Sequence, residues 1–113
     1  MPFVSINAAM PISEAKMDVI QKEIGRIIAL IPGKTIDNCM TQIVGDANMF
    51  MSGGPKKAVY CEVRVYGPAP KESKDNVVAA LDELFQTELG CEKMYVNFVE
   101  STEWGNGGSD AKK

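Results

Sequence analysis

The amino terminus places a proline where it can do chemistry. Pro2 follows the initiator methionine and opens the apolar run Pro2-Phe3-Val4-Ser5-Ile6. Because a small second residue favours removal of the leading methionine, processing would leave Pro2 with a free secondary amine. An α-amino group ordinarily has a pKa of about 7.7–8.0, and burial or a neighbouring cation lowers it. Such an amine suits general acid–base catalysis near neutrality. The alternative at this point is that Pro2 merely follows a start codon.

The remaining reactive side chains narrow the chemistry further. Histidine is absent, which removes the commonest general base and metal ligand. The three cysteines, Cys39, Cys61 and Cys91, are far apart and form no CxxC pair, so we expect reduced thiols and neither a disulfide framework nor a zinc site. No glycine-rich phosphate loop is recognisable. We therefore expect no metal and no organic cofactor, with catalysis left to an amine, carboxylate, phenol, lysine or thiol.

Length and composition bound the class of protein. The 113 residues suit one domain, and 45% apolar with 24% charged residues is ordinary globular composition. The net charge is −3 and the basic residues are scattered, so we expect neither nucleic acid nor an anionic membrane as partner. The amino terminus does not resemble a signal peptide. These features favour a cytoplasmic location, with secretion by another route left open.

Two helices and four strands must position these residues. Apolar residues recur at helical spacing from 14 to 31 and from 71 to 89, with Gly33 and Gly90 as stop signals. Ser13 is the expected N-cap of the first helix. Strands are expected at residues 2–8, 38–44, 58–66 and 94–99, and residues 45–57 as a loop or short edge element. The predicted domain covers residues 1–107, and residues 108–113 are expected to form a loose polar tail.

The two halves of the chain repeat one pattern. A β-α-β order occurs twice at an offset of about 58 residues, which predicts an α+β fold with two helices on one face of a four-stranded mixed sheet. We expect the other face to be rich in Val, Ile and Tyr and to be buried by self-association. A ligand-sensing domain of ferredoxin-like topology is an alternative, and it would be a dimer without need of a free proline.

Four segments in order carry a family resemblance. These are the proline with its apolar strand, Gly33-Lys34 after the first helix, Met49-Phe50-Met51-Ser52-Gly53-Gly54, and Tyr95-Val96-Asn97-Phe98 followed by Trp104-Gly105. Over residues 2–107 the chain resembles the tautomerase superfamily, and within it the macrophage migration inhibitory factor and D-dopachrome tautomerase group. The resemblance implies a homotrimer whose sheets form an inner barrel, with active sites at subunit boundaries.

The resemblance also implies roles for individual residues. Pro2 would be the acid/base that interconverts keto and enol forms of an α-keto acid such as phenylpyruvate. Lys34 would hold the substrate carboxylate, and Tyr66 would contribute a backbone amide near it. Tyr95 and Asn97 of the adjacent subunit would line the same pocket. The family's signalling members imply the alternative of a cytokine-like binding protein with weak tautomerase activity, for which no receptor is identified.

Several residues keep a second interpretation. Lys34 can instead complement the carboxyl end of a helix. Arg64 shares a strand face with Tyr66 and can bind a carboxylate, but a structural pairing with Glu62 or another acid in the trimer is the preferred interpretation. Trp104 either walls the pocket or pins the tail. Two departures from the vertebrate cytokine pattern are Asn38, where a tyrosine is usual, and the missing CxxC, which removes support for thiol oxidoreductase activity.

Overall fold

The structure is a computed structural model that describes residues 2–107; the expected tail at 108–113 lies outside these residues. Its elements, in chain order, are β1 (Phe3–Ala8), α1 (Glu14–Ile28), a 3-10 turn η1 (Ile36–Asn38), β2 (Met40–Val44), β3 (Phe50–Met51), β4 (Gly54–Pro55), β5 (Ala58–Tyr66), α2 (Lys71–Leu89) and β6 (Lys93–Ser101).

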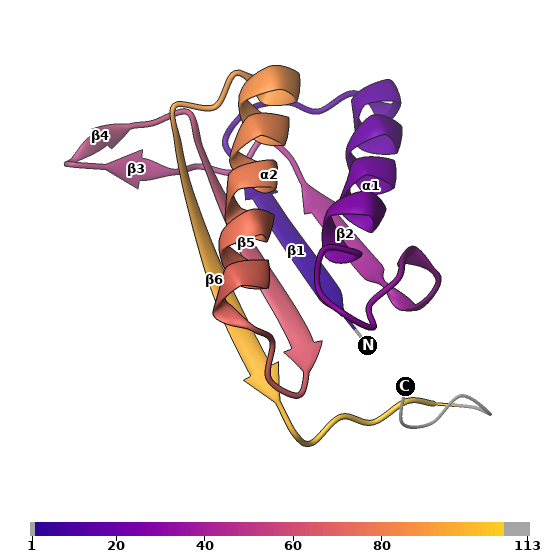
Figure 1. Ribbon diagram of the computed structural model, residues 1–113. Coiled ribbons are helices and arrows are strands. Elements are labelled where there is room, and N and C mark those ends of the chain that lie inside the picture. Colours follow the sequence, from indigo (N-terminus) through magenta and orange to yellow (C-terminus); the bar gives the residue numbers. More distant parts are fainter. Residues whose placement is uncertain (1, 108–113) are drawn as a thin grey trace.

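A four-stranded sheet in the order β2-β1-β5-β6 forms one layer, and α1 and α2 cover one of its faces (Figure 1). β1 runs parallel to β2, β5 runs parallel to β6, and the two central strands β1 and β5 are antiparallel. Each half of the chain is thus one β-α-β unit, and the halves join through β1 and β5. The predicted fold class and internal duplication are confirmed.

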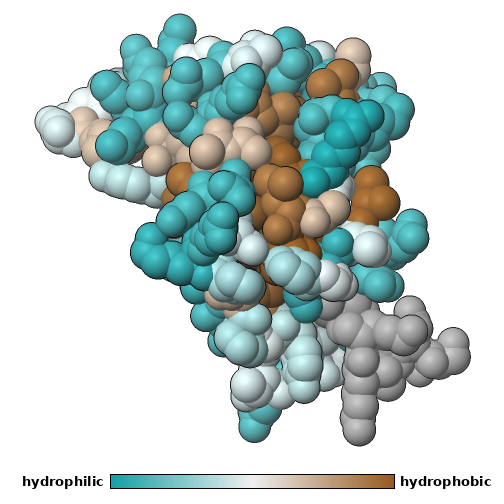
Figure 2. All heavy atoms as spheres, in the orientation of Figure 1, coloured by the Kyte–Doolittle hydropathy of each residue, from teal (hydrophilic) through white to brown (hydrophobic). Residues whose placement is uncertain are grey.

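The core lies between the sheet and the helices, because alternate strand residues face the helices. It is formed by buried apolar side chains from both layers, including Val4, Ile6, Ile20, Ile24, Val63, Leu81 and Phe85. On the outer side of the helices the surface is mainly polar, and apolar side chains show between the two helices (Figure 2). Within residues 2–107, neither helix is long and apolar enough to cross a membrane.

The helix ends follow local signals, with one difference from the prediction. The Ser13 hydroxyl accepts the Lys16 N–H and caps α1 as expected. Gly90 ends α2 in the left-handed conformation, with φ 62°. α1 ends at Ile28, three residues early, because Ile31 N–H bonds to the carbonyl of Ile28 in a tighter turn. Ile31 remains in the core, so its apolar pattern extended the predicted helix beyond its end.

The open face of the sheet differs from the prediction. Along β5 the helix-facing positions are Val59, Cys61, Val63 and Val65, and the open-face positions are Ala58, Tyr60, Glu62, Arg64 and Tyr66. The open face also carries Ser5, Asn7, Gln42 and Asn97 on the other strands. The expectation of a face rich in Val and Ile was wrong, since strand alternation sends most of these residues to the helices. The tyrosines expected on this face do lie there, as Tyr60, Tyr66 and Tyr95. Self-association through this face would therefore use hydrogen bonds and charges as well as apolar contact.

The short strands β3 and β4 form a hairpin that extends away from the sheet (Figure 1). Its turn contains Ser52 and Gly53, both with positive φ. Phe50 is 69% exposed there. Residues 45–57, expected as a loop or short edge element, thus contain a separate two-stranded sheet.

Candidate active site

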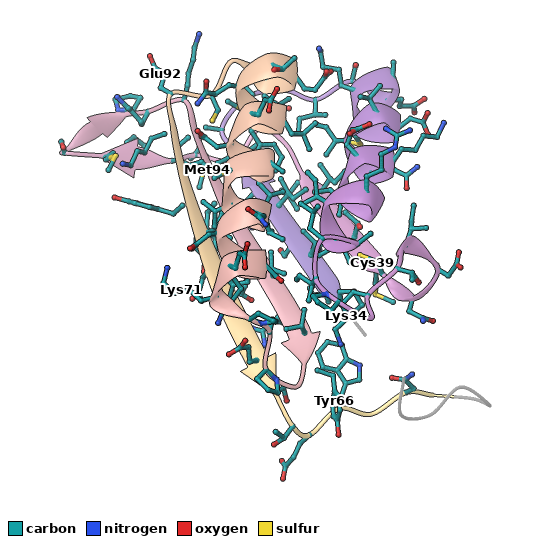
Figure 3. The ribbon with its side chains drawn as sticks, viewed as in Figure 1. Lys34, Cys39, Tyr66, Lys71, Glu92 and Met94 are labelled. Atoms are coloured by element: carbon teal, nitrogen blue, oxygen red, sulfur yellow. The ribbon has the colours of Figure 1, made fainter. Side chains whose placement is uncertain are left out.

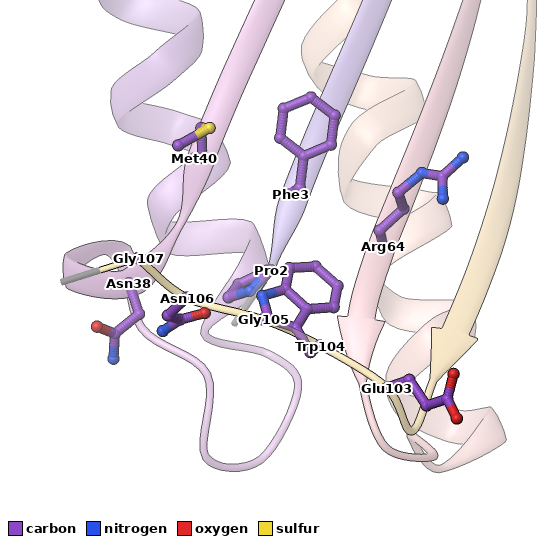
Figure 4. Close-up of a pocket in the computed structure, with 10 residues that line it drawn as sticks. All are labelled: Pro2, Phe3, Asn38, Met40, Arg64, Glu103, Trp104, Gly105, Asn106 and Gly107. Atoms are coloured by element: carbon purple, nitrogen blue, oxygen red, sulfur yellow. The ribbon is translucent and has the colours of Figure 1, made fainter. Parts of the chain in front are cut away.

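Pro2 lies buried at the start of β1, beside the first residue of β2. Its carbonyl oxygen accepts the Met40 N–H at 3.0 Å, which fixes the chain end against the edge strand. A cavity of about 640 Å³ opens at this place (Figure 4). The cavity is lined by Pro2, Phe3, Asn38, Met40, Arg64, Glu103, Trp104, Gly105, Asn106 and Gly107.

Three side chains form a row across the sheet beside Pro2. Phe3 is the register partner of Met40 on β2 and of Arg64 on β5, so the three project from one level of the open face. Met40 is 68% exposed, which leaves its thioether available to a ligand. The row gives the cavity an apolar wall with a cationic side chain at one end.

The segment after β6 closes the other side of the cavity. The Ser101 hydroxyl donates to the Glu103 carbonyl at 2.9 Å, and the Gly67 N–H donates to the Ser101 carbonyl at 2.7 Å, so the chain is held as it leaves the sheet. Trp104 then lies next to Pro2 in Figure 4. Of the two interpretations offered for Trp104, the structure supports the pocket wall.

Lys34 lies near this end of the molecule but outside the cavity lining. Gly33, with φ 81°, turns the chain after α1, and the Lys34 ammonium donates to the carbonyl of Tyr66 at 3.1 Å (Figure 3). The contact between these two predicted residues is therefore with the carbonyl of Tyr66. The prediction had instead named the backbone N–H of Tyr66, as a donor to the substrate carboxylate. Arranged this way, Lys34 holds the end of β5 close to the loop that follows α1.

Arg64 borders the cavity and is paired with an acid. Its Nε donates to Glu62 Oε1 at 2.7 Å, the preferred structural pairing. Glu62 also accepts the Tyr60 hydroxyl at 3.1 Å. Hydrogen bonds from Arg64 first, and then from Tyr60 and Asn97, hold the pKa of the Glu62 carboxyl below its usual range. The carboxylate therefore stays ionised at neutral pH.

Tyr95 and Asn97 lie on the open face of β6, at the level of Tyr60 and Glu62. Neither residue lines the cavity of its own chain. The resemblance implied that they line the cavity of an adjacent subunit, which a single chain does not test. Tyr95 is exposed, and the Lys93 ammonium lies 5.2 Å from the centre of its ring. Within one chain they belong to the polar open face.

The sequence reasoning missed part of the lining. Phe3 and Met40 were treated as strand residues, and Glu103 was not singled out. The register between β1 and β2 puts Met40 beside Phe3, and this register cannot be predicted from the pattern of residues along either strand. In residues 2–107 no group of three or more His, Cys, Asp or Glu side chains could hold a metal ion. The cavity thus combines Pro2 with the apolar side chains of Phe3, Met40 and Trp104, and with two charged side chains, Arg64 and Glu103.

Comparison with known proteins identifies the family. Residues 1–110 match the family described as macrophage migration inhibitory factor (MIF). The fold resembles MIF2 of Leishmania major (21% identity, 96% of this chain and 95% of that chain, TM-score 0.88). It also resembles the MIF-like protein of Entamoeba histolytica (25% identity, 93% of this chain and 94% of that chain, TM-score 0.82). A third similar structure is the MIF of Toxoplasma gondii (18% identity, 97% of this chain and 99% of that chain, TM-score 0.86).

Among curated proteins none matches this chain at a significant level. The family match spans nearly the whole chain, and the solved structures share the duplicated β-α-β architecture over more than nine-tenths of it. The chain therefore belongs to the macrophage migration inhibitory factor family, within the tautomerase superfamily.

Proposed function

We propose that the protein is a keto–enol tautomerase for an α-keto acid such as phenylpyruvate, with processed Pro2 as general acid and base. The observation that carries this proposal is the position of Pro2, buried at the strand start and lining a cavity with Phe3, Met40 and Trp104. An apolar wall of this kind suits an aryl group. Family membership supports the reaction class.

In the proposed reaction the neutral Pro2 amine removes a proton from the carbon next to the keto group. The electron pair of the broken C–H bond forms the C=C bond of the enol, and the negative charge moves to the carbonyl oxygen. The Pro2 ammonium then returns its proton to that oxygen. Because Pro2 both removes and returns the proton, these steps need no other proton carrier. A positioned acid/base contributes about 10²–10⁴-fold to the rate.

Other residues would bind the substrate. Lys34 supplies a cation for the carboxylate, and Tyr66, Arg64 and Trp104 are the neighbouring groups of the same chain. Tyr95 and Asn97 would come from an adjacent subunit in a homotrimer, with the polar open face of each sheet turned towards the next subunit. Sedimentation equilibrium tests this assembly, and a stable monomer would contradict the shared site.

Retention of Met1 is the direct test of the amine. Acylation converts the Pro2 nitrogen into an amide without useful basicity, whereas the strand loses no hydrogen bond because an internal proline has no N–H to donate. Two preparations separated by intact mass, with and without Met1, should share one circular dichroism spectrum. Only the processed form should turn over phenylpyruvate. Equal turnover by the form that keeps Met1 would refute the proposal.

A cytokine-like binding protein with weak tautomerase activity is the second candidate, favoured by the family to which the chain belongs. Comparing the processed wild type with Pro2→Gly in binding and turnover assays separates the two functions. If binding alone survives the substitution, binding does not depend on the tautomerase site.

A further inference from the structure

The charge on Arg64 is engaged away from the cavity that this residue borders. Arg64 lines the cavity, yet its guanidinium runs along the sheet, away from Pro2 and Trp104 (Figure 4). Its Nε donates to Glu62 Oε1 at 2.7 Å. The side chain of Arg64 is 48% exposed, whereas that of Glu62 is 21% exposed, so the acid is the more firmly enclosed partner.

Glu62 is itself fixed from several sides. Its second oxygen accepts the Tyr60 hydroxyl at 3.1 Å. In the sheet Glu62 lies between Ser5 on β1 and Asn97 on β6. The pair is therefore built into the middle of the open face, with the carboxylate as its anchor and the long arginine side chain as its adjustable part.

This arrangement decides how much positive charge the cavity offers. The charged side chains that line it are Arg64 and Glu103. Glu62 neutralises Arg64 and occupies one edge of its guanidinium, the group that otherwise binds carboxylates bidentately. A ligand carboxylate at Arg64 must therefore compete with a carboxylate that the protein already supplies.

We propose that Glu62 determines substrate specificity by holding Arg64 on the open face, so that the site accepts ligands with one carboxylate and discriminates against those with two. The inference rests on the proposed function, in which one carboxylate is bound elsewhere, by Lys34. Glu62→Gln removes the competing charge but keeps an amide oxygen that can accept from Arg64. Released from the ion pair, the guanidinium can take up a second ligand carboxylate.

The test uses ligands that bind without reacting. 3-Phenylpropionate and phenylsuccinate share a phenyl ring and differ by one carboxylate. Trp104 is the sole tryptophan and lines the cavity, so its fluorescence reports binding without turnover. In Glu62→Gln the affinity for phenylsuccinate, relative to 3-phenylpropionate, should rise about tenfold, the size expected of one charge-assisted hydrogen-bonded contact.

Two variants make the result specific. Glu62→Gln combined with Arg64→Ala should return the affinity ratio to the wild-type value, because the released cation is gone. Glu103→Gln removes a carboxylate from the cavity without freeing Arg64, and should raise the ratio less than Glu62→Gln does. An unchanged ratio in Glu62→Gln, or a gain that persists in the double variant, would overturn the inference.

The proposed function has a separate readout in the same preparations. If processed wild type binds both ligands but does not turn over phenylpyruvate, the tautomerase proposal fails and the specificity inference stands or falls on the ratio alone. If wild type turns over phenylpyruvate and Glu62→Gln leaves the ratio unchanged, only the inference fails. The absence of any Trp104 response in all variants would overturn it as well.

Discussion

Gly25 in α1 should resist the alanine substitution that stabilises most helices. In a helix interior, alanine is favoured over glycine by about 1 kcal/mol. Here a Cβ on residue 25 would lie 2.3 Å from Cδ1, 2.6 Å from Cγ1 and 2.8 Å from Cβ of Ile36. Rotating the Ile36 side chain relieves the first two contacts, but the third needs a shift of the backbone of η1.

Overpacking of this kind costs about 1–3 kcal/mol, so Gly25→Ala should lower the free energy of unfolding by about 1 kcal/mol after the helix gain is subtracted. For a chain of this size that corresponds to a fall in Tm of about 4 °C. The displaced segment matters for function, because η1 ends at Asn38 and leads into Met40, and both line the cavity.

Ile36→Ala provides the matched control. Ile36 is 48% exposed, so truncating it should cost only about 1 kcal/mol. In the double variant the contacts with Cδ1 and Cγ1 are absent and the contact with Cβ remains, so the two substitutions should couple by about 1 kcal/mol in a double-mutant cycle measured by thermal denaturation at one protein concentration. A Gly25→Ala variant more stable than the wild type, with no coupling to Ile36, would refute this reasoning.

Three further predictions concern ionisation and thiols. The kcat/KM for phenylpyruvate should fall on the acidic side as the Pro2 amine takes up a proton, and a flat profile would count against Pro2 as the base. The N–H of Ala69 first, and then Lys74, hold the pKa of the Glu100 carboxyl below its usual range. The contribution of Glu100 to the free energy of unfolding should be fully present above about pH 4.3, the ordinary pKa of a glutamate. It should be lost as the pH falls through the lower pKa that Glu100 has in the folded protein. Glu100→Gln should therefore lower Tm at pH 7, and the two proteins should converge in acid. Burial raises the pKa of the Cys61 thiol to about 12, and the less buried Cys39 should react first with a thiol reagent under native conditions. Peptide mapping that finds Cys61 labelled before Cys39 in folded protein would contradict this.

Local patterns were sufficient for much of the fold. The bounds of β5 and α2 agree with the prediction, since alternation and the Gly90 stop mark them within the sequence itself. The end of α1 was placed too late because Ile31 is buried without being helical. The composition of the open face was misjudged because counting residue types ignores which side of the strand each one faces.

The site was harder to predict than the fold. Pro2, Arg64 and Trp104 do line one cavity. The neighbours Phe3 and Met40 depend on the register between β1 and β2, which arises from tertiary pairing and not from the local sequence. Lys34, Tyr66, Tyr95 and Asn97 lie outside the cavity of the single chain, and their proposed roles require a second subunit or movement of a side chain.

The antiparallel contact between β1 and β5 has a consequence during synthesis. The first β-α-β unit is complete once residue 44 has emerged from the ribosome, yet β5, the second neighbour of β1, ends at Tyr66. At about 5–20 residues per second, the 22 intervening residues take about 1–4 s to translate. For that interval the nascent first half has an unpaired edge along β1. Unpaired strand edges invite association with other chains, so slow translation of residues 45–66 should favour aggregation of the nascent protein.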